Sequence, residues 1–138
     1  MTEANRGRNI ADEVERATQA LRAAEALLAL GLHADAISRA YYAAFHLVRA
    51  MLLTRGVEPR SHHGAIHLLN VELVRSGDFP ASHNRLLAGL QRQREIADYD
   101  AAVPFTAEDA RAAVDDARAF ETDARAALDR WGFGATTS

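Results

Sequence analysis

Residues 38–46, SRAYYAAFH, place an arginine, two tyrosines and a histidine in a segment that otherwise has the composition of a helix core. Each residue of an α-helix turns the chain by about 100°, so residues three or four apart share a face. One face of this helix would carry Ile37, Tyr41, Phe45, Val48 and Leu52. Another face would carry Arg39, Tyr42, His46 and Arg49. The stretch therefore predicts an amphipathic helix with one face for packing and another that could do chemistry.

Helical periodicity extends from this segment over the whole chain, and neither strand-like alternation nor an internal repeat is detectable. We expect five helices, at about 8–30, 34–54, 61–75, 80–99 and 106–132. Glycine, which readily adopts the left-handed conformation of a helix end, follows or closes four of them, at Gly31, Gly56, Gly77 and Gly132. Ser61 and Thr106 stand where N-caps are needed, and Thr106 with Asp109 resembles a capping box.

The connections between these helices are short, which makes consecutive helices antiparallel neighbours. The predicted fold is therefore an all-α, up-and-down bundle of four long helices and one shorter helix. A chain of 138 residues has room for one such domain, and we expect its ordered core at about 9–132.

Composition excludes several classes of protein. The chain is 49% hydrophobic and 25% charged, and it has no apolar run long enough for a membrane span. The stretch MTEANRGRNI at 1–10 lacks the apolar run of a secretory signal, so we expect no export. We expect a cytoplasmic protein without membrane contact. The absence of cysteine excludes disulfides, thiolate metal sites and a cysteine nucleophile.

Charge and motifs narrow the function further. A net charge of −3 gives no general attraction to DNA, so we expect no DNA binding, and any contact with RNA must come from a local basic patch. The sequence contains no GxSxG, glycine-rich phosphate loop or HExxH motif. His63 and His67 have the spacing of a metal pair but lack an acidic third ligand. We expect neither a metal nor a cofactor.

Polar residues form two candidate anion sites in the first half of the chain. Arg39, Tyr42 and His46 lie in line on helix 34–54, where they could contact a phosphate or an RNA backbone. The alternative is that they satisfy one another at the edge of the core. Arg60, Ser61 and His62 stand at the start of helix 61–75, where free backbone N–H groups attract anions. The alternative there is a simple N-cap with solvated histidines.

A third candidate site lies at the end of helix 80–99. Arg94 and Asp98 are one turn apart, and Tyr99 follows. A guanidinium oriented by a carboxylate can bind a phosphate through two hydrogen bonds. The alternative is an intrahelical ion pair that contributes only about 0.3–0.5 kcal/mol.

The polar motifs of the chain, taken in their order along the sequence, resemble those of the HEPN family (higher eukaryotes and prokaryotes nucleotide-binding). The resemblance is to the small stand-alone bacterial and archaeal members in particular. The matching motifs are SRAYYAAFH at 38–46, LLTRG at 52–56, SHHG at 61–64 and REIADYD at 94–100. A weaker match is EDARAAVDDARAF at 108–120, which is similar to the closing helix of that family. The resemblance covers about 10–130, nearly the whole chain.

The resemblance implies a four-to-five-helix bundle that forms a homodimer. It also implies a protein partner, because such proteins are often encoded beside a minimal nucleotidyltransferase as a toxin–antitoxin pair. Active members are metal-independent ribonucleases with a composite site across the dimer. Their usual motif is an arginine, four to six residues and then a histidine. The arginine positions phosphate and the histidine assists attack by a 2′-hydroxyl, which leaves a cyclic phosphate.

This chain departs from that motif. Four residues separate Arg94 from Tyr99, which stands where the shortest form of the motif has a histidine. With an ordinary pKa of about 10, a tyrosine is a poor general base at neutral pH. His46 or His62 could substitute if the bundle brings its helix beside Arg94. Our candidate catalytic residues are Arg94, Tyr99 and His46. Our candidate nucleotide- or phosphate-binding residues are Arg39, Tyr42, Arg60, Ser61, His62 and Asp98.

Three functional hypotheses follow. The first is a HEPN protein of a toxin–antitoxin-like pair that binds nucleotide or RNA and a nucleotidyltransferase, with a degenerate catalytic motif. The second is a toxin-type endoribonuclease with a composite site at a homodimer interface. The third is a purely structural helical homo-oligomer, in which Arg39, Arg94 and Asp98 are internally paired and serve stability alone.

Overall fold

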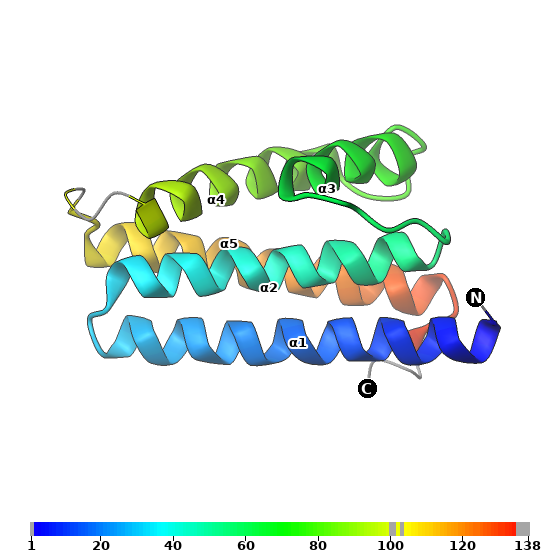
Figure 1. Cartoon of the computed structure of the whole chain (residues 1–138), viewed down its shortest axis with the longest axis horizontal. Helices are drawn as coiled ribbons and strands as arrows, with labels where there is room; N and C mark the ends of the chain where they lie inside the picture. Colours follow the sequence, from blue (N-terminus) through cyan, green and yellow to red (C-terminus); the bar gives the residue numbers. More distant parts are fainter. Residues whose placement is uncertain (1, 100–101, 103, 135–138) are drawn as a thin grey trace.

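The protein is an all-α bundle, as its sequence predicts (Figure 1). The structure is a computed structural model and describes residues 2–99, 102 and 104–134. Within them, every regular element is helical: α1 (Glu3–Ala29), α2 (His33–Leu53), α3 (His62–Leu69), the π-helical turn η1 (Asn70–Val74), α4 (Ala81–Tyr99) and α5 (Ala107–Arg130). The four long helices alternate in direction along the chain, whereas α3 is short and lies over α2 (Figure 1).

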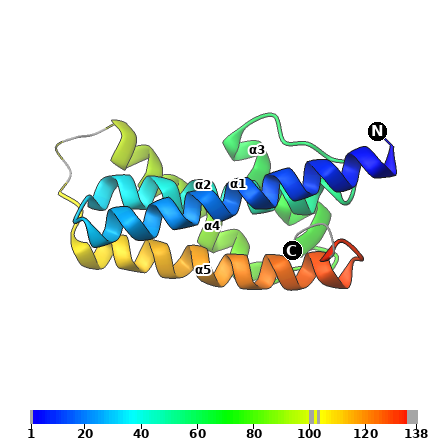
Figure 2. The same ribbon diagram turned by 90° about the horizontal axis from the view of Figure 1, so that it is seen from below.

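Helix α2 is the centre of the bundle and packs against α1, α4 and α5. Its predicted packing face is confirmed, because Ile37, Tyr41, Val48 and Leu52 are fully buried and Phe45 packs against the core. The view from below shows α1 and α5 side by side along the bundle, while α4 crosses it obliquely (Figure 2). The oblique crossing places the end of α4 over α2, where the candidate site lies.

The last helix follows its predicted apolar stripe. The buried residues of α5 include Ala110, Ala113, Val114, Ala117, Phe120, Ala124 and Leu128. Thr106 accepts a hydrogen bond from the backbone N–H of Asp109, and the Asp109 carboxylate accepts one from the N–H of Thr106. This reciprocal capping box fixes the start of α5, as the sequence predicts.

Two helix boundaries differ from the prediction. Helix α1 begins at Glu3 instead of at about residue 8, because the Thr2 hydroxyl accepts a hydrogen bond from the N–H of Asn5 and caps the helix earlier. The predicted helix at 61–75 is α-helical only to Leu69 and continues as the π-helical turn. At its end the N–H of Arg75 bonds to the carbonyl of Asn70, one residue further back than in an α-helix.

Glycine ends helices where expected. Gly31 and Gly56 have φ values of 77° and 72°, a left-handed conformation that other residues rarely adopt. Among the described residues, no helix is both long enough and apolar enough to span a bilayer.

Candidate functional site

Arg94, on α4, lies nearly buried against two tyrosines of α2. Its side chain is 7% exposed, and its Cζ atom lies 5.1 Å from the ring centre of Tyr41 and 5.8 Å from that of Tyr42. Both distances fit cation–π contact. One turn later, Asp98 holds an oxygen 3.5 Å from Nη1 of Arg94. The Nε atom of Arg94 is buried and has no hydrogen-bond partner among the described residues. This guanidinium is therefore positioned but only partly satisfied.

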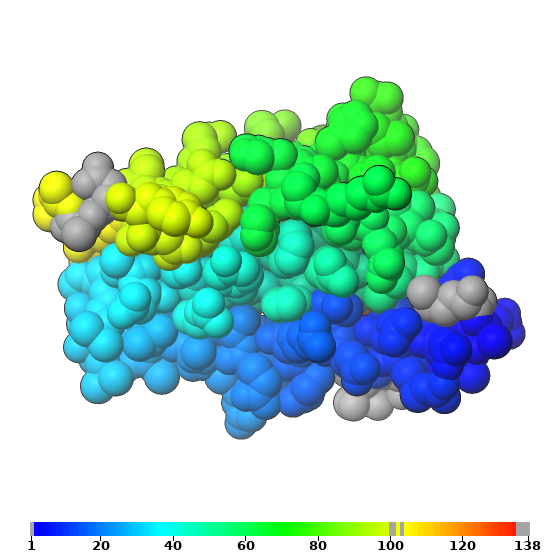
Figure 3. Space-filling model, in the orientation of Figure 1, coloured from blue at the N-terminus to red at the C-terminus, as the bar shows by residue number. Residues whose placement is uncertain are grey.

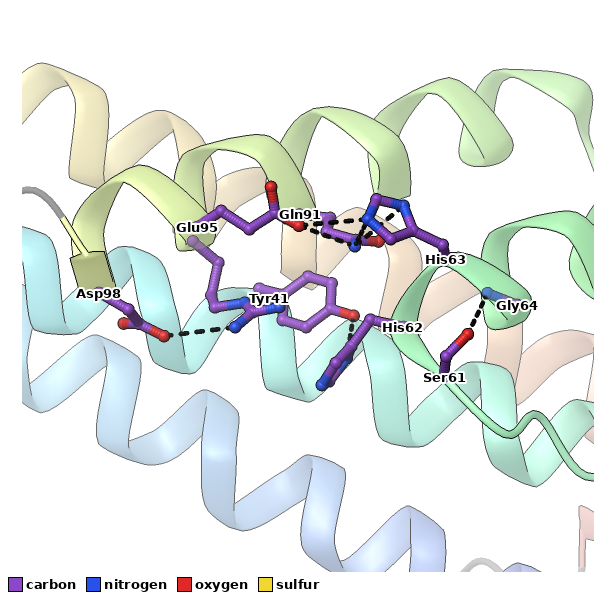
Figure 4. A network of polar contacts seen from close by, with 9 residues as sticks. Tyr41, Ser61, His62, His63, Gly64, Gln91, Glu95 and Asp98 are labelled. Carbon is purple, nitrogen blue, oxygen red and sulfur yellow. Dashed lines mark hydrogen bonds and ion pairs between the residues drawn. The ribbon is translucent and has the colours of Figure 1, made fainter.

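Tyr41 connects Arg94 to α3. Its Oη lies 2.6 Å from Nδ1 of His62, and the two ring centres are 5.4 Å apart (Figure 4). Ser61 places His62 as the first residue of α3, because its hydroxyl accepts a hydrogen bond from the N–H of Gly64 at 2.9 Å. Figure 4 shows the Tyr41 ring between Asp98 on one side and His62 on the other. The sequence prediction that helix 61–75 could bring His62 near Arg94 thus has a geometric basis.

The surroundings of Tyr41 and His62 keep both side chains uncharged. Burial raises the pKa of Tyr41 well above its ordinary value, so its phenol stays protonated. Burial also lowers the pKa of His62, and the charge of Arg94 lowers it further. Among the described residues the protonated Tyr41 hydroxyl has Nδ1 of His62 as its acceptor, so the neutral ring carries its proton on Nε2. The cluster therefore combines an imidazole N–H donor with a fixed guanidinium, and both groups can bind a phosphate oxygen.

Arg39 joins the same group through Tyr42. The Cζ atom of Arg39 lies 4.8 Å from the ring centre of Tyr42, which also contacts Arg94 and the His62 ring. Two guanidinium groups from different helices therefore meet on one tyrosine. We name this group the Arg94 cluster; it consists of Arg39, Tyr41, Tyr42, His62, Arg94 and Asp98.

His46 is not part of the Arg94 cluster but pairs with Glu13 of α1. Its Nδ1 lies 2.8 Å from Oε2 of Glu13, and Nε of Arg49 donates to Oε1 of the same carboxylate at 3.1 Å. Burial alone would raise the pKa of Glu13, but the hydrogen bonds and charges of His46 and Arg49 outweigh it and lower this pKa. Glu13 is therefore a buried carboxylate, 7% exposed, with two close partners, and Nη1 of Arg16 lies further away at 3.8 Å.

A groove of about 600 Å³ lies between α1 and α2 and connects these two groups. Its walls are formed by Glu15, Arg16, Gln19, Ala20, Ala23, Arg39, Tyr42 and His46. Figure 3 shows the surface of α2 between that of α1 below and those of α3 and α4 above. Arg39 and Tyr42 belong both to the groove and to the Arg94 cluster, so the two sites are continuous.

Three predicted site residues lie apart from the cluster or are already engaged. Tyr99 is 80% exposed at the end of α4 and makes no contact with the cluster among the described residues. Arg60 is exposed and forms no hydrogen bond or ion pair with another described residue. The Ser61 hydroxyl caps α3. Asp100, which ends the REIADYD motif, is outside the described residues.

Several residues around the site were not singled out from the sequence. Glu13 is one, and its signal was present, because it follows the helical spacing of the buried residues Ile10, Val14 and Ala17 on α1. Gln91 is another; its amide contacts the ring of His63 and donates to Glu95 at 3.2 Å (Figure 4). Within the described part of the chain, no three His, Asp or Glu side chains gather as a metal site.

Comparison with known proteins agrees with the fold. Residues 10–126 match the model of the HEPN domain. A protein of Methanocaldococcus jannaschii named "Putative toxin MJ0605" is 34% identical over 115 residues, which cover 83% of this chain and 85% of that protein. A protein of Pyrococcus horikoshii named "UPF0332 protein PH1297" is 41% identical over 56 residues, 38% of this chain and 39% of that protein. The chain belongs to the HEPN family.

Proposed function

We propose that this protein is the HEPN component of a toxin–antitoxin-like pair and that the Arg94 cluster binds the phosphate of a nucleotide or RNA. The observation that carries the proposal is the state of Arg94. It is held against Tyr41 and Tyr42, it has Asp98 as its ion-pair partner among the described residues, and its Nε lacks an acceptor. A guanidinium desolvated in this way binds an incoming anion strongly.

Two further observations support a role for the cluster beyond stability. Arg39 is exposed and reaches the cluster from the solvent side of α2, where it can contact a phosphate without unfolding the bundle. His62 is kept neutral beside Arg94, and because its Nδ1 accepts from the protonated Tyr41 hydroxyl, its Nε2–H can donate to a phosphate oxygen. The alternative hypothesis of a purely structural homo-oligomer, in which these residues serve stability alone, gives no reason for the exposed Arg39 beside Tyr42.

Binding is favoured over cleavage because of Tyr99. The usual family motif has a histidine after four to six residues from the arginine, whereas the sequence has Tyr99, Asp100 and Ala101 at those positions. Tyr99 is exposed and makes no contact with the cluster among the described residues. The likeness to a protein named as a toxin supports the assignment to a toxin–antitoxin-like pair. We propose a homodimer and a nucleotidyltransferase partner, as the family resemblance implies.

The binding proposal is tested by fluorescence anisotropy with a labelled single-stranded RNA. Arg94→Gln should weaken binding about tenfold or more, which is the loss of one or two charge-assisted hydrogen bonds. Arg92→Gln is the matched control, because Arg92 is an exposed arginine of the same helix outside the cluster. Equal affinities of the two variants, with circular dichroism showing both folded, would contradict the proposal.

The partner proposal is tested by co-expression with the protein encoded by the adjacent gene. A complex that survives size-exclusion chromatography, in which light scattering gives two copies of this chain, is the expected result. A strict monomer at micromolar concentration would contradict the homodimer. An adjacent gene that encodes no nucleotidyltransferase, or one whose product forms no complex, would contradict the partner.

A metal-independent endoribonuclease is the second candidate, and the placement of His62 favours it. His62 and Arg94 both contact Tyr41, so an imidazole and a guanidinium lie close together. This candidate predicts RNA cleavage in EDTA with 2′,3′-cyclic phosphate ends, abolished by His62→Gln. Intact RNA after prolonged incubation, with no growth defect when the protein is induced, would exclude it.

A further inference from the structure

The pairing of His46 with Glu13 fixes which ring nitrogen of His46 carries a proton. A carboxylate can only accept hydrogen bonds, and Nδ1 of His46 lies 2.8 Å from Oε2 of Glu13. Arg49 binds the other oxygen of Glu13, and together the two partners keep this buried carboxylate ionised. Nδ1 must therefore be the donor. In the neutral ring, Nε2 is then unprotonated and accepts hydrogen bonds.

Because Nδ1 is engaged by Glu13, Nε2 is the ring nitrogen left to bind a ligand. His46 lines the groove and its side chain is 22% exposed. Among the described residues, no group is hydrogen-bonded to Nε2. An unprotonated nitrogen repels the oxygens of a phosphate but suits a hydroxyl, which can donate to it.

The charges around His46 complement a phosphorylated ligand. Arg39 lines the groove and forms no ion pair with another described residue. Arg16 is 66% exposed and lies 3.8 Å from Glu13, whose closer partners are His46 and Arg49. Glu15 is the opposing carboxylate, and it accepts a hydrogen bond from the Gln19 amide at 2.9 Å. The groove thus offers two guanidinium groups for phosphate and one acceptor nitrogen for a hydroxyl.

We propose that the α1–α2 groove binds one ribonucleotide unit and recognises its sugar. Nε2 of His46 accepts a hydrogen bond from the ribose 2′-hydroxyl, while Arg39 and Arg16 contact the adjoining phosphate. Glu13 acts as a positioning residue that holds His46 in the required tautomer. The inference rests on the proposed function, since Arg39 and Tyr42 are shared with the Arg94 cluster. It adds discrimination between RNA and DNA, because DNA lacks the donor hydroxyl.

The test compares three labelled oligonucleotides of one sequence: single-stranded RNA, single-stranded DNA and 2′-O-methyl RNA, which cannot donate from the 2′ position. At pH 8 the wild-type protein should bind RNA about fivefold to tenfold more tightly than the other two, the effect of about 1 kcal/mol from one hydrogen bond. His46→Ala should bring RNA affinity to the level of DNA and leave DNA affinity unchanged. His67→Ala is the matched control, because His67 is an exposed histidine outside the groove.

A readout on the folded wild-type protein tests the role of Glu13 without a variant. Two-dimensional ¹H–¹⁵N spectra of the imidazole ring distinguish the two neutral tautomers, and we expect the Nδ1–H form for His46. Glu13→Leu should lose this preference together with the RNA preference. If that variant does not fold, the wild-type spectrum decides, and an Nε2–H tautomer would overturn the inference.

The source of the ribonucleotide is settled by a separate comparison. Adenosine 5′-monophosphate and its 2′-deoxy form are titrated by calorimetry against the same proteins. A preference for the ribose form that His46→Ala removes indicates a free nucleotide as ligand, whereas the same preference seen only with the oligonucleotides indicates an RNA strand. Either result supports recognition of the sugar.

The outcomes separate this inference from the function on which it rests. Equal binding of RNA and DNA, with both weakened by Arg94→Gln, would overturn sugar recognition and leave phosphate binding by the Arg94 cluster intact. A preference for RNA that persists in His46→Ala would also overturn it. Failure of oligonucleotides and mononucleotides alike to bind would contradict the proposed function itself, and the inference with it.

Discussion

Tyr41 and His62 are joined by a hydrogen bond of 2.6 Å between Oη and Nδ1, and this bond ties the short helix α3 to the centre of the bundle. Tyr41 is fully buried on α2, whereas His62 begins α3 after a connecting segment of irregular structure. The contact is supported by Phe45, whose ring centre lies 4.6 Å from that of His62. The position of the imidazole beside Arg94 therefore depends on a residue of the core.

Tyr41→Phe removes the hydroxyl of this bond and keeps the ring. We expect the free energy of unfolding to fall by about 1 kcal/mol, the net contribution of one hydrogen bond. Urea denaturation at neutral pH measures it. Tyr99→Phe is the control, since Tyr99 is exposed and its hydroxyl has no partner among the described residues. A stability equal to that of the wild type would show that the bond contributes nothing.

The depressed pKa of His62 makes stability depend on pH. The unfolded chain binds a proton at His62 near pH 6.5, whereas the folded chain binds it only at lower pH, so unfolding becomes easier as the pH falls below about 6.5. Above that value the two states are equally neutral and the effect vanishes. Denaturation curves between pH 7.5 and pH 5 should therefore show a smaller decline in His62→Gln than in the wild type. A decline of the same size in both proteins would refute the prediction, and His67→Gln controls for loss of a histidine.

The salt dependence of RNA binding reports the phosphate contacts of Arg39. Each contact with single-stranded nucleic acid makes the slope of log affinity against log salt concentration more negative by about 0.7. Arg39→Gln should therefore bring this negative slope about 0.7 closer to zero and weaken binding of all sequences alike. Arg85→Gln, an exposed arginine of α4 outside the cluster, should leave the slope unchanged. An unaltered slope in Arg39→Gln would remove Arg39 from the interface.

The contribution of the capping box at the start of α5 to the stability of the protein should be measurable by itself. Thr106→Ala removes the hydroxyl that accepts the N–H of Asp109, and we expect a loss of about 1 kcal/mol of stability. Thr122→Ala is the comparison inside the same helix, where the hydroxyl bonds to the carbonyl of Arg118 and alanine is the better helix former. Thermal unfolding of the two variants gives the answer, and equal melting temperatures would disagree with the prediction.

Local chemistry explains which parts of the fold could be predicted. The two faces of α2, the caps Ser61 and Thr106 and the glycine helix ends each depend on residues within one or two turns of one another. The earlier start of α1 at Glu3 follows the same rule, and Thr2 was the overlooked cap.

The candidate site depends on contacts that sequence spacing does not encode. His46 and Glu13 are 33 residues apart, and only the register of α1 against α2 brings them together. The Tyr41–His62 bond depends on the path of the segment that joins α2 to α3. Helical periodicity placed Arg39 and His46 on one face of α2 correctly. It could not show that His46 pairs with Glu13 of α1 while Arg39 contacts Tyr42 of the Arg94 cluster.

Tyr42 contacts the guanidinium groups of both Arg39 and Arg94, and it also forms part of the groove wall. A displacement of its ring would therefore alter the contacts of both proposed sites. A ligand that moves Tyr42 at one site changes the affinity of the other, and thermodynamic reciprocity requires the two effects to be equal in free energy. If both proposed sites bind ligands, this shared ring would couple them, with a sign set by whether the two occupants favour the same ring position.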